Sequence, residues 1–189
     1  MENSHGGSLT SRLSRLYRTS AAAETLLLIL LGVVGVALHA YLRLPIKVPG
    51  HNGLLWIALL IVGRLVSQRR WAASISSTSA AAISLLPVMG FKDPLDTITL
   101  LIPGVVIDLA FLISPRLLAS LVALALVGAF AHATKPIAKL IVSAGTGFPY
   151  PSLIAGILYP LSLHALFGAA GAILAAISVR LVSRDDKPS

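Results

Sequence analysis

The sequence predicts an all-α integral membrane protein, a six-transmembrane-helix bundle with both termini in the cytoplasm. Two features of composition lead to this fold class: 56% of the 189 residues are hydrophobic, and only 12% are charged. About a quarter of the residues of a soluble domain are charged, so a chain with half that share fits a lipid environment. The third observation is a series of six apolar segments, because about 20 such residues cross the hydrocarbon core as a helix.

The six segments differ in length. The second is short, whereas the last is long enough that Pro160 is expected to kink or break it and leave residues 152–159 as a separate outer piece. We therefore expect a cytoplasmic tail at 1–20, a six-helix transmembrane domain at 21–183 and a second cytoplasmic tail at 184–189. The predicted helices are residues 23–42, 54–67, 71–89, 95–114, 116–133 and 152–182, with a long outer connection at 134–151.

Basic residues between these segments set the predicted orientation. With the N-terminus inside, eight Lys or Arg residues fall in inner segments and five in outer ones, which is the bias that cytoplasmic loops show. The net charge of +8 is therefore assigned to topology and not to nucleic acid. The inner set is Arg12, Arg15, Arg18, Arg69, Arg70, Arg116, Arg184 and Lys187; the outer set is Arg43, Lys47, Lys92, Lys135 and Lys139.

Polar and aromatic side chains gather at the outer ends of the predicted helices. Every histidine except His5 falls on this side, and the stretch "KVPGHNGLLW" (47–56) contains a Pro-Gly turn that would bring His51 there. Tyr and Trp collect at any membrane interface, so a purely interfacial role is the alternative for most of these residues. His164 lies inside a span, where an imidazole needs a partner or a cavity. The predicted substrate-binding set is His39, His51, Asn52, Trp56, Asp96, His132, Tyr150, Tyr159 and His164.

Two charges lie deeper in the predicted spans. Arg64 and Asp108 have opposite signs and comparable depth toward the inner face. A lone charge inside a bilayer is costly, which predicts a structural ion pair between them. The alternative for Arg64 is that its side chain extends to the inner headgroups.

Small residues recur every four positions in two of the predicted helices. Such faces let helix backbones approach closely, either within a bundle or against another protein. For the third helix, with Ala72, Ser76 and Ala80 on one face, we expect internal packing. For the last helix a partner is an equal alternative, and its docking residues would be Gly168, Ala172 and Ala176.

The chain lacks the sequence motifs of common catalytic sites. HExxH, GxSxG, a phosphate-binding glycine-rich loop and paired carboxylates do not occur, and there is no cysteine. We therefore expect no enzymatic activity, no cofactor and no resident metal. Acidic residues near the midplane and inverted repeats, which are typical of ion-driven transporters, are not evident either. Binding without its own energy coupling fits better.

The stretches "LRLPIKVPGHNGLLW" (42–56) and "LLIPGVVIDLAF" (100–111), set in a chain of six predicted spans, resemble the substrate-binding S components of energy-coupling-factor vitamin transporters. The resemblance covers most of the chain. It implies a multi-pass protein of a bacterial or archaeal cytoplasmic membrane whose outer loops close over a small vitamin. It also implies partners, namely a membrane-embedded coupling subunit and two ATPases.

Two other functions remain open from the sequence. A structural or assembly subunit of a larger membrane complex would use the small-residue face of the last helix. A metal-ion transporter would use His39, His51, His132 and His164, because neutral imidazoles suit zinc, nickel or cobalt. For a binding protein, the mixture of aromatic, Asn, His and Asp side chains favours a planar, polar heterocycle as substrate.

Overall fold

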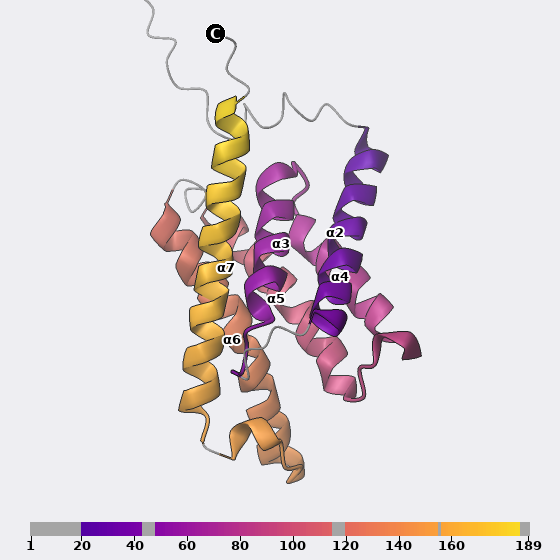
Figure 1. The fold of residues 1–189 in the computed structure, drawn as a ribbon, viewed down its shortest axis with the longest axis vertical. Coiled ribbons are helices and arrows are strands. Elements are labelled where there is room, and N and C mark those ends of the chain that lie inside the picture. Colours follow the sequence, from indigo (N-terminus) through magenta and orange to yellow (C-terminus); the bar gives the residue numbers. More distant parts are fainter. Residues whose placement is uncertain (1–19, 43–47, 115–119, 155, 186–189) are drawn as a thin grey trace, which may run out of the picture.

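A computed structural model describes residues 20–42, 48–114, 120–154 and 156–185. Within these ranges the chain forms six α-helices, two short 3₁₀ helices and no strand (Figure 1). Residues 1–19 and 186–189 of the predicted tails lie outside the described ranges, as do the basic residues Arg43, Lys47 and Arg116. The elements are α2 (Ala21–Tyr41), α3 (Gly53–Val66), α4 (Ala72–Ser84), η1 (Pro87–Met89), α5 (Pro94–Ile113), α6 (Leu121–Thr146), η3 (Pro151–Leu153) and α7 (Leu158–Asp185).

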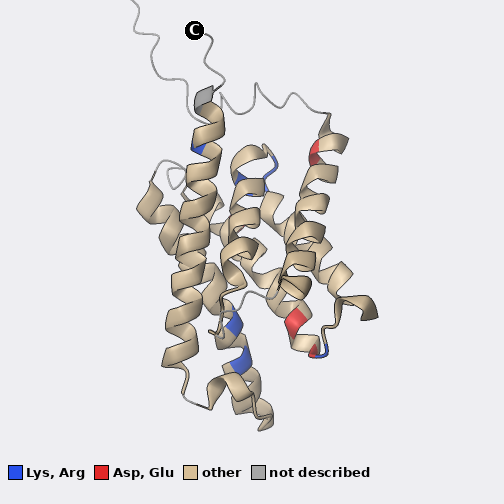
Figure 2. Cartoon of the chain, in the orientation of Figure 1, with Lys and Arg blue, Asp and Glu red and all other residues tan. Residues whose placement is uncertain are grey.

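Four of the helices are long and apolar enough to cross a membrane, namely α2, α5, α6 and α7. α3 is apolar but has only 14 residues, and α4 has 13. Figure 2 shows the charged residues of the described chain gathered toward the two ends of the bundle, with few between them. This distribution suits a bilayer, because charged side chains inside the hydrocarbon region are costly. The predicted helical, multi-pass membrane class is thus confirmed at the level of four candidate spans.

Two predicted helix ends are wrong by more than one turn. The third predicted helix was expected to reach residue 89, but α4 ends at Ser84, because a residue before a proline disfavours helical geometry and Pro87 starts a separate 3₁₀ helix. The fifth was expected to end at residue 133, but α6 continues through Pro136 to Thr146, so most of the predicted outer connection is helical. The helix does not break at Pro160, and residues 158–159 belong to α7 and not to a separate outer piece. α7 begins at Leu158 and holds Pro160 in its first turn, where the missing N–H removes no helical hydrogen bond.

α4 lies between α2 and α5 and packs against both. Ala72, Ser76 and Ala80 are buried, as the four-residue spacing predicts, and Ala73, Ser77 and Ala81 are buried beside them, which confirms internal packing. The Oγ of Ser76 donates a hydrogen bond to the carbonyl of Leu28 at 2.8 Å, and the Oγ of Ser79 donates to the carbonyl of Ile29 at 3.0 Å. These bonds join α4 to the backbone of α2. Small side chains therefore permit both the close approach and the hydrogen bonds across it.

Gly32 of α2 lies where α2 and α4 come closest, and replacing it tests whether the two helices are packed closely there. A methyl group at Gly32 would meet the backbone carbonyl oxygen of Ser76, which cannot rotate away. We expect Gly32→Ala to lower the free energy of unfolding in detergent micelles by about 1–3 kcal/mol, as overpacking does. Gly145→Ala is the matched control, since no atom lies within 4 Å of a methyl group there. Equal stability of the two variants would contradict the close packing of α2 on α4.

The small-residue face of α7 is also inside the bundle, so of the two alternatives left open by the sequence, internal packing and not the docking of a partner is found. Gly168 faces the backbone carbonyl of Gly128 in α6, while Ala172 is 0% and Ala176 2% exposed. α7 packs against α6 and α3 along this face. A partner could reach these residues only by displacing α6 or α3. The same spacing that permits docking between proteins is used here within one chain.

The connection between α3 and α4, residues 67–71, is held by carboxylates from two other helices. Glu24 of α2 accepts hydrogen bonds from the Oγ of Ser67 at 2.6 Å and the backbone N–H of Gln68 at 2.7 Å. Asp108 of α5 accepts from the backbone N–H groups of Ala73 at 3.2 Å and Ser74 at 2.7 Å. These N–H groups belong to the first turn of α4, which has no intrahelical partners for them.

The predicted ion pair between Arg64 and Asp108 is present at this end of the bundle. The Nε of Arg64 lies 3.5 Å from Oδ1 of Asp108, whose side chain is fully buried. The guanidinium carbon of Arg64 also lies 4.9 Å from the ring centroid of Phe111. The arginine is therefore turned toward the bundle and does not extend away from it, so α3 and α5 are joined by a buried charge pair.

Candidate ligand-binding cavity

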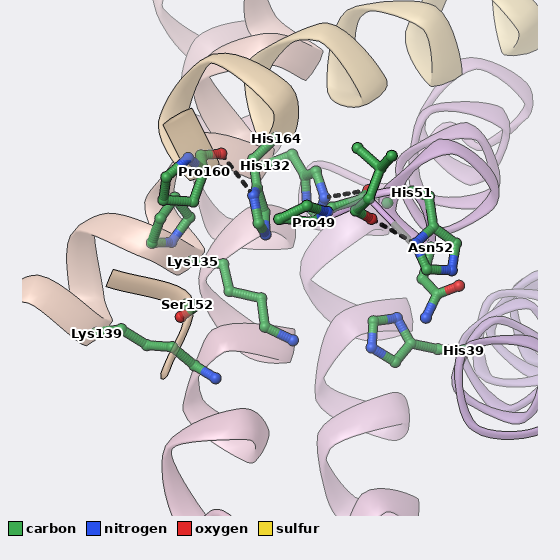
Figure 3. Close-up of a pocket in the computed structure, with 14 residues that line it drawn as sticks. His39, Pro49, His51, Asn52, His132, Lys135, Lys139, Ser152, Pro160 and His164 are labelled. Carbon is green, nitrogen blue, oxygen red and sulfur yellow. Dashed lines mark hydrogen bonds between the residues drawn. The ribbon is translucent and has the colours of Figure 1, made fainter. Parts of the chain in front are cut away.

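A cavity of about 220 Å³ lies where the end of α2, the start of α3, the middle of α6 and the start of α7 meet (Figure 3). Its wall also includes the turn at residues 48–53 and Ser152 of η3. The first and the last lining residues, His39 and His164, are more than a hundred positions apart in the sequence, so they come together only in the folded chain. Five of the nine predicted substrate-binding residues line this cavity: His39, His51, Asn52, His132 and His164.

The turn at residues 48–53 explains why the apolar sequence is interrupted by "PGHNG". Gly50 has φ of +83°, a conformation that side chains disfavour, and this lets the chain reverse direction before α3. Its carbonyl accepts a hydrogen bond from Nε2 of His132 at 3.1 Å. A methyl group at Gly53 would collide with the ring of His132, and one at Gly50 would lie 2.9 Å from Nδ1 of His164. The two glycines therefore let the turn close directly over both histidines.

Three histidines of the cavity are oriented by backbone carbonyls. Nδ1 of His51 lies 2.7 Å from the carbonyl of Val48, Nε2 of His132 3.1 Å from that of Gly50, and Nδ1 of His164 2.7 Å from that of Pro160. A carbonyl can only accept, so each of these ring nitrogens donates its proton. In the neutral ring the other nitrogen is then an acceptor. The rings of His132 and His164 lie with their centroids 4.7 Å apart, and both side chains are buried.

His39 comes from the last turn of α2 and lies on the opposite side of the cavity from α6 (Figure 3). Its ring stacks on Phe91 with the centroids 5.8 Å apart. Nδ1 of His39 is buried and has no hydrogen-bond partner within the described part of the chain. Such an atom is uncommon in a folded protein, because an unsatisfied buried polar group destabilises the fold. His39 therefore offers a ligand a ring nitrogen that no protein group occupies.

Lys135 and Lys139 also line the cavity, and we had assigned them to an outer loop as topology charges. They stand one helical turn apart on the part of α6 that the hydropathy pattern missed. Nζ of Lys135 lies 3.4 Å from Oδ1 of Asp96, and Nζ of Lys139 lies 3.5 Å from the same oxygen and 3.7 Å from Oδ2 of Asp93. Two features of the sequence could have predicted this cluster: two lysines spaced K-x-x-x-K, which share one face of a helix, and two aspartates three residues apart at positions 93 and 96.

The remaining four predicted residues lie outside the cavity wall. Trp56 is 2% exposed and packs over Gly35, with no hydrogen-bond partner for its Nε1 in the described chain. Asp96 contacts the lysines and does not line the cavity. Tyr159 is 53% exposed and is the one member of the set that faces away.

Tyr150, the fourth, supports the lysine side of the cavity. Its ring lies 5.2 Å from Nζ of Lys139, a cation–π contact, and packs edge-on against Phe148 with the centroids 4.9 Å apart. Burial, followed by the charges of Asp93 and Asp96, raises the pKa of the Tyr150 phenol. The hydroxyl therefore keeps its proton in neutral solution, and Tyr150 fixes the position of Lys139 as a neutral aromatic ring.

The arrangement offers hydrogen-bond acceptors and ammonium donors around one small space. Within the described ranges, no group of three or more His, Asp or Glu side chains is placed so that it could hold a metal ion. The four histidines of the metal-transporter hypothesis are thus near one another without forming a coordination site in this conformation. Comparison with protein-family models, curated proteins and solved structures finds no match to this chain.

Proposed function

We propose that the chain is a membrane-embedded binding protein that captures a small, polar, heterocyclic molecule in this cavity for uptake. The observation that carries the proposal is the convergence of His39, His51, His132 and His164, from four separate segments, on one cavity. Each ring is oriented by a carbonyl or by stacking, which favours recognition of a defined molecule.

The proposed topology has six spans with both termini in the cytoplasm and the cavity open to the outside. The start of α2 and the end of α7 lie at the same end of the bundle in Figure 1, and the cavity lies toward the other end. The short helices α3 and α4 would complete the bundle together with their flanking connections. The excess of basic residues in the inner segments supports this orientation.

The proposed role in uptake follows from the resemblance to substrate-binding S components. A protein of this kind has no energy source of its own, and it would deliver its cargo together with a membrane coupling subunit and ATPases of a bacterial or archaeal cytoplasmic membrane. The alternative role as an assembly subunit loses its main support, because the small-residue face of α7 is buried within the chain. Cavity occupancy is therefore the property to test first.

We expect His51→Ala and His164→Ala each to weaken retention of the molecule that copurifies with the protein. Each change removes one oriented ring nitrogen, and a hydrogen bond of about 0.5–1.5 kcal/mol corresponds to a loss of roughly two- to tenfold. Gentle denaturation followed by mass spectrometry measures the amount released per protein. Tyr159→Ala is the control, since this side chain is exposed and does not line the cavity. Equal retention in all four proteins, or no released molecule from any, would contradict the proposed function.

A further inference from the structure

The charged groups on the cavity wall are all cationic. Lys135 and Lys139 line it, and none of the fourteen lining residues is Asp or Glu. In Figure 3 both lysine side chains extend from α6 into the space that separates it from His39. The nearest carboxylates, Asp93 and Asp96, belong to the start of α5 and approach the ammonium groups without lining the cavity. A molecule in the cavity thus meets ammonium groups first.

The carboxylates leave part of each ammonium group available. An ammonium group carries three N–H donors. Among the described residues, Lys135 has one carboxylate contact at 3.4 Å and Lys139 has two, at 3.5 and 3.7 Å. Both lysine side chains are 18% exposed, so water or a ligand can reach them. While the cavity is empty, Asp93 and Asp96 also offset part of the desolvation free energy of the two ammonium groups, which are largely buried.

The facing wall complements these donors. The ring of His39 lies on the side toward which Lys135 extends, and its Nδ1 is buried without a hydrogen-bond partner among the described residues. An oxyanion between them would receive N–H donors from Lys135, Lys139 and the His39 ring. His51, His132 and His164 also line the cavity, and in each neutral ring the nitrogen that does not donate to a carbonyl is an acceptor.

We propose that the cavity takes a soluble small molecule that bears an oxyanion, a carboxylate or a phosphate, at its lysine end and N–H groups at its histidine end. This inference deepens the proposed function and rests on it. The anion occupies the space between His39 and the two lysines, and Asp96 competes with it for their ammonium groups. Asp96 therefore acts against ligand binding, in contrast to the direct contact predicted from the sequence.

Inorganic phosphate is the defined probe of this oxyanion site. In wild-type protein freed of its copurified molecule, phosphate should raise Tm relative to chloride at equal ionic strength, because binding to the folded state stabilises it. Lys139→Gln and Lys135→Gln should each weaken phosphate binding by roughly ten- to a hundredfold, the range for charge-assisted hydrogen bonds. Lys92→Gln is the matched control, because Lys92 is exposed and outside the cavity. If Lys135→Gln fails to fold, Lys135→Gln with Asp96→Asn keeps the net charge and should bind phosphate more weakly than Asp96→Asn alone.

Asp96→Asn should change the phosphate affinity in the opposite direction from the lysine variants. Removal of a carboxylate within ion-pair distance of both ammonium groups should tighten phosphate binding by about three- to tenfold. Weaker phosphate binding in Asp96→Asn would overturn the inference, as would equal binding in the lysine variants and the Lys92 control. A copurified molecule without an acidic group, or a phospholipid, would overturn it too. If that molecule still depends on His51 and His164, the proposed function stands while this inference fails.

Discussion

Replacement of Asp108 by alanine is expected to lower the free energy of unfolding by about 3–5 kcal/mol, the range for breaking a buried ion pair. The side chain is fully buried and lies 3.5 Å from Nε of Arg64. It also accepts the backbone N–H groups of Ala73 and Ser74 at the start of α4. Alanine would leave a guanidinium without its counter-charge and two N–H groups without an acceptor. Unfolding in mixed detergent micelles, followed by circular dichroism, measures the change.

Two further variants separate the charge from the hydrogen bonds. Asp108→Asn keeps an acceptor for the α4 N–H groups, so we expect a loss between those of alanine and wild type. The double variant Arg64→Leu, Asp108→Leu removes both charges and should recover part of the stability, as apolar replacement of buried pairs often does. If the double variant is less stable than Asp108→Ala alone, Arg64 does not depend on Asp108 for its buried position.

Gly53→Ala is expected to reduce retention of the copurified molecule by about tenfold or more. The new methyl group would collide with the ring of His132, the same ring that donates a hydrogen bond to Gly50. The ring must move, and the turn at 48–53 must move with it, so two walls of the cavity change together. Overpacking of this kind also lowers the free energy of unfolding by about 1–3 kcal/mol. Mass spectrometry of the released molecule and unfolding in micelles measure the two effects.

Helix propensity alone predicts the opposite for this change, because alanine stabilises a helix relative to glycine by up to about 1 kcal/mol. Gly145→Ala, which has the same substitution without a neighbour within 4 Å, should show only that small gain and full retention. Unchanged retention in Gly53→Ala would mean that His132 is not held where the turn requires it.

For the described ranges, the sequence predicts the six α-helices and most of their bounds, because the hydropathy of a segment indicates whether lipid or other protein segments can cover it. It fails at α6, where Thr134, Lys135 and Pro136 end the apolar run although the helix continues to Thr146. Lys135 and Lys139 line the cavity and lie within ion-pair distance of Asp96 and Asp93, while the hydroxyl of Thr134 donates to the carbonyl of Ala131 in its own helix. A helix whose polar residues are satisfied by other parts of the chain cannot be recognised from its own hydropathy.

The small-residue faces show a second limit. The spacing in α4 and in α7 predicts close backbone approach equally well, and in both cases it occurs. The spacing does not predict whether the neighbouring helix belongs to the same chain or to another protein. For α7 the neighbouring helix is α6 of the same chain, which only the three-dimensional arrangement reveals.

For the site, chain position and side-chain type identified the histidines correctly as neighbours, because helix ends on one side of a membrane protein lie close together. Tyr159 shares their depth but is turned outward, since depth does not fix the direction of a side chain around its helix. The lysines were missed because a cation outside an apolar run is assigned to topology by default. Their role depends on Asp93 and Asp96, which lie 39 or more residues earlier in the chain.

A density map of the protein purified without removal of small molecules shows directly whether the cavity holds a ligand. We expect density for one compact molecule in the space bounded by His39, His51, His164 and Lys139. An empty cavity in the purified protein, or a bound molecule at another place in the bundle, would contradict the proposed function.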